Sequence, residues 1–363
     1  MATDAKRRLI VSSKTLMAFF VLLVCVFSVF VRLLNVSLPF SYDYSSYIEI
    51  IGELLTLSFR EMIGVRLIFP YVIANRIIPV EFGFALFVKM LAAFIGNSAE
   101  IYAVIATLSV GLRTYVMVKL RIPFVWIALL NIYGITLWES NALRLGLAVS
   151  LLLFGLYKLR HGKTVAGWTF AALSVTFHLQ NILFLAPFLA FYLIRKYMQK
   201  SVKRVVIANI AATLAMPILV YFLPSIGNQK LAFYISQTGS GSAGLTVTSV
   251  LAAIFMASAL LKRKKTIGDD QSERFCMLIL SAGIPSIFLL LFLTDVAVLG
   301  DRAWQVAFII LATFFTGTFP LRGQMMLPYL VLFALAFVSV VNVGVRYPLS
   351  DFFSYALPNV DPN

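Results

Sequence analysis

Two arginines, each at the start of an apolar segment, are the residues in this chain best suited to do chemistry. Arg144 follows Glu139 by five positions, and Arg302 directly follows Asp301. Each would fall about one turn inside a membrane helix, where a cation is costly unless it has a partner or an anionic ligand. The planar guanidinium can bind phosphate oxygens through two parallel hydrogen bonds. The two arginines therefore predict a site for an anionic lipid head group, best a pyrophosphate, unless each arginine only pairs with the acid near it.

A histidine at the end of another apolar segment is the first candidate for a general base. His178 is one of only two histidines, and the other, His161, lies in a basic loop. A neutral imidazole can take the proton of an attacking hydroxyl. A histidine at a helix end often has only a structural role, but this one lies on the same predicted face as the two arginines. Glu139 and Asp43 are the alternative bases.

Aromatic residues beside acids predict a sugar site on that face. Tyr44 and Tyr47 follow Asp43 in the segment 41–47, and Trp138 precedes Glu139. Aromatic rings stack on the apolar face of a sugar, and a carboxylate accepts hydrogen bonds from its hydroxyls. The alternative is a belt of aromatic residues at the membrane interface.

The sequence lacks the phosphate-loop and paired-ligand motifs of nucleotide and metal sites. It contains no G-x-x-x-x-G-K-[ST] loop, no Asp-x-Asp pair and no C-x-x-C spacing, and its G-x-G-x-x-G match at 239–244 falls in the predicted outer loop 224–244. We therefore expect no cofactor and no metal. A transfer reaction would take its energy from a preformed, lipid-linked donor.

The composition indicates the scaffold that positions these residues. Of the 363 residues, 61% are hydrophobic and 12% are charged, against about 45–50% and about 25% in a soluble domain. This excludes a soluble enzyme with a single anchor and predicts an all-α, polytopic membrane protein. The net charge of +15 is better explained by basic loops on one side of a membrane than by nucleic-acid binding.

Apolar runs long enough to cross a bilayer, about 20 residues each, divide the chain into about 11 predicted transmembrane helices. Basic residues cluster in alternate connections, which places the N-terminus in the cytoplasm and the candidate site on the opposite face. We expect one transmembrane domain over 1–363, with an outer helical segment at 37–98 and an outer loop at 224–244. The predicted crossings are 15–36, 99–118, 122–138, 142–158, 164–178, 180–196, 203–223, 245–262, 275–294, 303–320 and 324–342.

Two stretches do not fit the predicted pattern of crossing helices. The apolar segment 81–95 is short and contains Lys89, so we expect a re-entrant or interfacial helix there and non-crossing helices over 44–79. The alternative is that 61–79 also crosses the membrane, which would bury Arg66 and Arg76.

Arg113 falls inside the predicted crossing 99–118, and we expect its side chain to extend towards the cytoplasmic surface.

In order along the chain, these residues resemble the EpsG/Wzy group of O-antigen and exopolysaccharide polymerases. The likeness covers about residues 40–310. The sequence departs from the family at two places: it lacks the proline that follows the family's equivalent of Glu81, and the Ser-Ala pair near the family's equivalent of His178. The matching pieces are Asp43-Tyr44 with Tyr47, Glu81-Phe-Gly-Phe84, Asn141-Ala-Leu-Arg144-Leu-Gly-Leu-Ala, Lys163, Phe177-His178, Lys230-Leu-Ala-Phe-Tyr234 and Asp301-Arg302.

The resemblance implies an enzyme of the bacterial inner membrane with a periplasmic active site and a periplasmic C-terminus. It would join undecaprenyl-pyrophosphate-linked oligosaccharides, donor and acceptor, and release polyprenyl pyrophosphate with inversion. A chain-length regulator is a possible partner. His178, Glu139 and Asp43 would be the catalytic candidates, and Arg144 and Arg302 would bind pyrophosphate. The expected sugar-binding residues are Tyr44, Tyr47, Glu81, Trp138, Tyr234 and Asp301.

Three other functions stay open on the sequence alone. In a GT-C lipid-linked glycosyltransferase, an acid of the first outer loop, here Asp43, would act as base and transfer one sugar. An O-antigen ligase usually carries a large late periplasmic loop, whereas the loop 224–244 is short. A polysaccharide or lipid flippase would show two related halves and charges along a path through the membrane, and neither pattern is present.

Overall fold

Helices make up almost all of the regular structure, as the composition predicts. The computed structural model describes residues 44–57, 71–73, 76–78, 80–139, 142–198, 271–279, 282, 297–319, 330 and 334. The helices and strands are α2 (Tyr44–Thr56), β1 (Tyr71–Ile73), β2 (Arg76–Ile78), α4 (Phe82–Ala92), α5 (Ser98–Lys119), α6 (Phe124–Gly134), the π-helical turn η1 (Ile135–Glu139), α7 (Leu143–Arg160), α8 (Thr164–Phe177), the 3-10 turn η2 (Leu179–Asn181), α9 (Ile182–Met198) and α14 (Ala297–Thr316).

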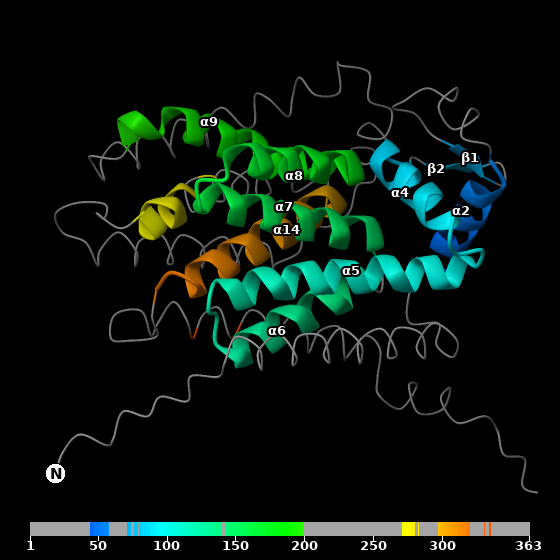
Figure 1. The fold of residues 1–363 in the computed structure, drawn as a ribbon, viewed down its shortest axis with the longest axis horizontal. Coiled ribbons are helices and arrows are strands. Elements are labelled where there is room, and N and C mark those ends of the chain that lie inside the picture. Colours follow the sequence, from blue (N-terminus) through cyan, green and yellow to red (C-terminus); the bar gives the residue numbers. More distant parts are fainter. Residues whose placement is uncertain are drawn as a thin grey trace, which may run out of the picture.

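The long helices run along one direction, and the smaller elements gather at one end of them. Figure 1 shows α5, α7, α8, α9 and α14 extended lengthwise, with α2, α4 and the two strands at one end of α5. In the part of the chain that the structure describes, α5 is the one helix long and apolar enough to cross a membrane, and several apolar helices are shorter. These helices are compatible with a membrane protein.

Local signals define α5, which matches the predicted segment 99–118. Its N-cap Asn97 accepts a hydrogen bond from the backbone N–H of Ala99 at 2.8 Å. Glu100 in the first turn and Lys119 in the last complement the helix dipole. Arg121 follows the helix in the left-handed region, with a φ of 57°, where the chain turns towards α6.

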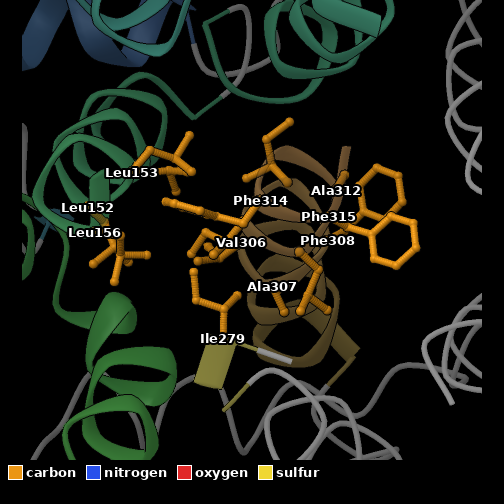
Figure 2. Packing of buried hydrophobic residues seen from close by; sticks show 14 of the residues in the cluster. Leu152, Leu153, Leu156, Ile279, Val306, Ala307, Phe308, Ala312, Phe314 and Phe315 are labelled. Carbon is orange, nitrogen blue, oxygen red and sulfur yellow. The ribbon is translucent and has the colours of Figure 1, made fainter. Parts of the chain in front are cut away.

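α7 lies at the centre of the packing because it is apolar on every side. Such a helix is stable when other elements surround it. Leu143 and Leu147 pack in one buried cluster with residues of α2, α4 and α5. Leu152, Leu153 and Leu156 belong to a second cluster with α6, α9, 271–279 and α14 (Figure 2). One helix therefore joins the two halves of the core.

The segment before α4 departs from the prediction. Helices were expected over 44–79; α2 forms, but β1 and β2 pair as an antiparallel hairpin with Tyr71 opposite Ile78. The β-branched residues of 71–78 and Asn75 between the strands favour this arrangement over a helix. The alternative of one crossing helix over 61–79 is therefore wrong.

α4 is a separate short helix, as expected for the segment 81–95. At 11 residues it spans about 16 Å, roughly half of the hydrocarbon core. Lys89, which made this segment unusual, donates from Nζ to the carbonyl oxygen of Leu55 at 3.1 Å. The lysine thus ties α4 to the C-terminal end of α2.

Candidate functional site

Three of the predicted site residues, Glu81, Arg144 and His178, come together from three different helix ends. Glu81 is the N-cap of α4, Arg144 is the second residue of α7, and His178 immediately follows α8. Glu81 Oε2 lies 2.5 Å from Arg144 Nη1, and Glu81 Oε1 lies 3.0 Å from His178 Nδ1. All three side chains are largely buried, with exposed fractions of 11%, 13% and 6%. One carboxylate therefore links a cation to a histidine in a sheltered place.

The backbone around Glu81 explains why its carboxylate is used in this way. Its φ of −70° and ψ of 140° are those of a typical N-cap, but its side chain makes no capping hydrogen bond. The two carboxylate oxygens instead serve Arg144 and His178 separately. The resemblance implied that Glu81 binds sugar. In the structure, Glu81 is also able to orient His178 and Arg144.

Arg144 is held on several sides. Its Nε donates to the hydroxyl of Tyr47 at 3.4 Å. Its guanidinium carbon lies 5.7 Å from the Tyr47 ring centroid and 6.0 Å from that of Phe84, within cation–π range. It also sits in the first turn of α7, where backbone N–H groups favour an anion. Arg144 pairs with Glu81, so the simple alternative in which it pairs with Glu139 is wrong.

The ring of His178 is fixed through both of its nitrogens. Nδ1 faces Glu81, and Nε2 lies 3.1 Å from the side-chain oxygen of Gln180. The carboxylate and the amide oxygen both only accept hydrogen bonds, so the two contacts together require a proton on each ring nitrogen. In the neutral ring, Glu81 keeps the proton on Nδ1, and Nε2 is the basic atom once the Gln180 oxygen no longer faces it. Gln180 is a contact that the sequence analysis missed, because a glutamine two residues after a histidine carries no signal of its own.

A close approach between α4 and α8 brings Glu81 to His178. A Cβ atom on Gly83 would lie 2.8 Å from the carbonyl oxygen of Thr176 and would overlap the Thr176 hydroxyl. Beside this contact, Phe87 and Phe177 meet edge to face at 5.7 Å. The glycine of the segment Glu81-Phe-Gly-Phe84 is therefore required for packing, two residues from the carboxylate.

We expect the Gly83→Ala variant to be less stable than the wild type by about 1–3 kcal/mol, the usual cost of overpacking a close contact. Thermal unfolding of the detergent-purified protein measures the change. Gly96→Ala is the matched control, because a Cβ there meets nothing within 4 Å. Equal unfolding midpoints for the two variants would show that α4 and α8 do not touch at Gly83.

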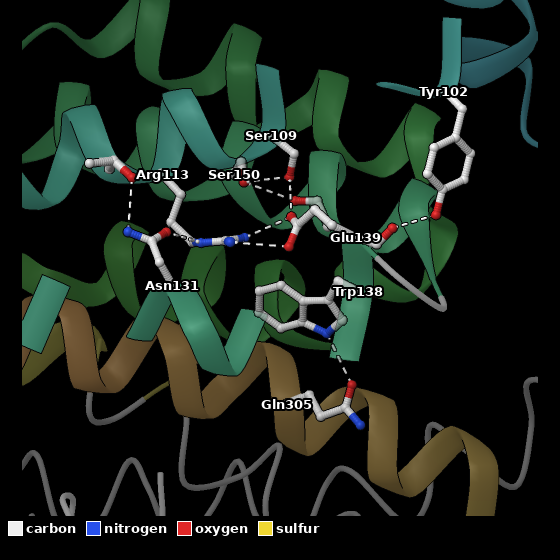
Figure 3. A network of polar contacts seen from close by, with 10 residues as sticks. Tyr102, Ser109, Arg113, Asn131, Trp138, Glu139, Ser150 and Gln305 are labelled. Atoms are coloured by element: carbon white, nitrogen blue, oxygen red, sulfur yellow. Dashed lines mark hydrogen bonds and ion pairs between the residues drawn. The ribbon is translucent and has the colours of Figure 1, made fainter. Parts of the chain in front are cut away.

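A second polar cluster lies deeper, between α5, α6, η1 and α7 (Figure 3). Arg113 and Glu139 form a two-pronged ion pair, with Nη1–Oε1 at 3.0 Å and Nη2–Oε2 at 3.1 Å, and neither side chain is exposed. The expectation that Arg113 extends to the cytoplasmic surface is therefore wrong. A buried partner makes the interior position of the arginine tolerable.

The surrounding polar groups complete the contacts of this pair. Arg113 Nε donates to the side-chain oxygen of Asn131 at 3.1 Å, and Asn131 donates to Thr114 Oγ1 at 2.9 Å. Ser109 Oγ donates to Glu139 Oε1 at 2.6 Å and lies 3.2 Å from Ser150 Oγ. Glu139, a candidate base, is thus 1% exposed within a network of protein partners.

The other predicted residues are spread more widely. Trp138 is fully buried, and its indole N–H donates to Gln305 Oε1 of α14 at 3.0 Å. Tyr44 begins α2, and Asp301 and Arg302 lie on α14, about one helical turn before Gln305. Asp43 and Tyr234 fall outside the described residues.

A metal site is not evident in the described residues, where no three His, Cys, Asp or Glu side chains gather closely enough to hold an ion. Glu81, Arg144 and His178 form what is called the outer cluster below, because it is less deeply buried than the cluster around Arg113. It offers an imidazole that is oriented by a carboxylate and lies next to an arginine. It can accept a proton from a hydroxyl and balance the charge of an anion.

Comparison with known proteins gives one family match. The model described as the EpsG family matches residues 68–357, more than half of the chain. The match includes Glu81, Arg144, His178 and the whole of the deeper cluster. Comparison with curated proteins and with solved structures finds no match.

Proposed function

Because this chain belongs to the EpsG family, we propose that it is a membrane glycosyltransferase that joins undecaprenyl-pyrophosphate-linked oligosaccharide repeat units into a polysaccharide. Family membership supports a polysaccharide polymerase-type role. The observation that carries the proposal is the sharing of one carboxylate, Glu81, between Arg144 and His178. In this proposal, Arg144 would receive the departing pyrophosphate, and His178 beside it would receive the proton of the attacking hydroxyl.

Arg144 would serve the leaving group. When the bond between the anomeric carbon and the pyrophosphate oxygen breaks, the electron pair stays on that oxygen, and the new charge needs a nearby cation. A guanidinium has five N–H donors, so it can hold Glu81 and a phosphate oxygen at the same time. Arg302, at the beginning of α14, would bind the same pyrophosphate.

His178 would serve the acceptor. With the acceptor hydroxyl in place of the Gln180 oxygen, its Nε2 takes the proton of that hydroxyl while the hydroxyl oxygen forms the new bond to the anomeric carbon. Glu81 accepts the Nδ1–H bond and stabilises the imidazolium that results. Attack on the face opposite to the departing pyrophosphate would invert the anomeric carbon. Tyr47, whose hydroxyl contacts Arg144, would bind sugar, and Tyr44 at the first residue of α2 would do the same.

The membrane setting follows the same proposal. We place the chain in the bacterial inner membrane with about 11 crossings, a cytoplasmic N-terminus and a periplasmic C-terminus. The cluster of Glu81, Arg144 and His178 would face the periplasm, where the lipid-linked donor and acceptor meet. A chain-length regulator would act on the product. No nucleotide, metal or nucleic acid is required by this chemistry.

Purified protein in detergent, incubated with its lipid-linked repeat unit and no nucleotide, tests the proposal. We expect a ladder of products that differ by one repeat unit on a gel, with release of polyprenyl pyrophosphate. A product lengthened by a single sugar would point to a GT-C glycosyltransferase, and transfer onto lipid A would point to a ligase. Movement of the substrate across liposome membranes with no ladder would make the protein a transporter and overturn the proposal.

A further inference from the structure

The ion pair of Arg113 and Glu139 has no evident role in substrate contact, because neither side chain is exposed. Burying two charges is costly, and apolar residues of similar size often give equal or greater stability. Ionisable residues within a membrane protein are by default candidates for a functional role. The question is therefore what this pair does for the candidate site.

Two glycines make room for the pair. A Cβ on Gly134 would lie 2.6 Å from the guanidinium carbon of Arg113, and a Cβ on Gly146 would lie 2.7 Å from Glu139 Oε1. Gly146 is two residues after Arg144 on α7. The carboxylate of Glu139 therefore rests directly against the first turns of the helix that carries Arg144.

The backbone of Glu139 is anchored as well. Tyr102, on α5, donates its hydroxyl proton to the carbonyl oxygen of Glu139. The residue ends η1, a π-helical turn, which is a form that often occurs at functional positions. From this turn, Trp138 points towards α14 and Glu139 towards Arg113 (Figure 3).

Trp138 connects η1 to α14, the helix that carries Arg302. Its indole N–H donates to Gln305 Oε1, and Arg302 lies three residues before Gln305 on α14. Residues three apart lie on neighbouring positions of one helix face. The Trp138–Glu139 turn thus contacts both the first turns of α7, at Gly146, and α14 at its ninth residue, Gln305.

We propose that the Trp138–Glu139 turn, held in place by Arg113, is a positioning element that sets the distance between Arg144 and Arg302. The inference rests on the proposed function, in which these two arginines bind one pyrophosphate. Trp138 and Glu139 then act through the arginines and do not touch the substrate. Small displacements of groups around a reacting centre are enough to slow a reaction by about 100-fold.

The test compares Trp138→Phe with Trp168→Phe. The first variant keeps an aromatic ring in the core but loses the indole N–H that reaches Gln305, the volume of the second ring and part of the ring face beneath Arg113. The second makes the same change on α8, where Trp168 contacts the rings of Phe188 and Tyr192. We expect Trp138→Phe to lower kcat by about 10-fold, with a smaller change in KM, and Trp168→Phe to behave as the wild type.

The double variant Arg113→Met with Glu139→Gln removes both charges and keeps the approximate volumes. If the pair only stabilises the fold, a double variant that unfolds at the wild-type temperature polymerises at the wild-type rate. If the pair positions the arginines, that variant loses about 10-fold in kcat or more. Wild-type kcat in both Trp138→Phe and a folded double variant would overturn the inference.

A distance measurement separates this inference from the proposed function. Spin labels on cysteines introduced at positions 144 and 302, with Cys25 and Cys276 replaced, report the separation of these two positions of α7 and α14 without any turnover. We expect the distribution of distances to broaden or shift when Trp138→Phe is added, and to stay unchanged with Trp168→Phe. An unchanged distribution overturns the inference even if the wild type forms a ladder. A shifted distribution supports the positioning role even if the wild type forms none, in which case only the proposed function falls.

Discussion

The Arg144→Ala variant is expected to form no detectable polymer while it still folds and inserts into the membrane. Removing one group that stabilises developing negative charge usually slows a reaction by about 100-fold or more. Here the change also removes the ion pair with Glu81, which orients His178. Arg144→Lys should rescue poorly, because an ammonium group keeps the charge but cannot donate to Glu81, Tyr47 and a phosphate oxygen in one plane. The ladder assay and the yield of folded protein measure the two effects.

Lys158→Ala provides the matched control at the other end of α7. The Lys158 ammonium lies over the rings of Phe154 and Tyr157, away from the outer cluster. Its removal should leave the ladder unchanged. Arg302→Ala should fail in the same way as Arg144→Ala. Full-length polymer from both arginine variants would eliminate the idea that they clamp a pyrophosphate.

The His178→Ala variant is expected to lose about 100-fold or more in kcat, with little change in KM. General-base groups usually contribute a factor of about 10² to 10⁴ to the rate, and a sugar hydroxyl is a poor nucleophile without one. The substrate would still be held by its pyrophosphate, so its binding should persist. Initial rates over a range of concentrations of the lipid-linked unit separate the two constants.

The second histidine supplies the control. His161 is exposed at the end of α7, where its Nδ1 lies 2.8 Å from the carbonyl oxygen of Tyr157. We expect His161→Ala to polymerise as the wild type does. If His178→Ala remains active and Asp43→Asn does not, the base is Asp43, and the single-sugar transfer of a GT-C enzyme becomes the better explanation.

The residue types of the outer cluster were predictable from the sequence, but their partnership was not. An arginine at the beginning of an apolar helix and a histidine at the end of another are visible as local patterns. Glu81 is 63 residues from Arg144 and 97 from His178, and no local period relates them. Their contact depends on the close approach of α4 and α8 at Gly83, which is a property of packing.

The partner of Glu139 could not be predicted from its position in the sequence either. Its place in the sequence, five residues before Arg144, made it a candidate partner and a candidate base. In the structure, the π-helical turn directs its side chain towards Arg113, 26 residues earlier on α5. Ser109 and Gly146, which lie against its carboxylate, come from α5 and α7. The role of a carboxylate thus depended on neighbours from other helices.

The sequence by itself determined α5, α7 and α8, because length of apolar run, capping residues and breakers are local properties. The predicted segments 99–118, 142–158 and 164–178 match α5, α7 and α8 within two residues at each end. Only the tertiary structure decided which helix ends meet, that the segment 71–78 is a hairpin, and that Arg113 is buried with Glu139. The physical reason is that ion pairs and glycine contacts join residues distant in the chain, and their energies exist only when the helices are packed.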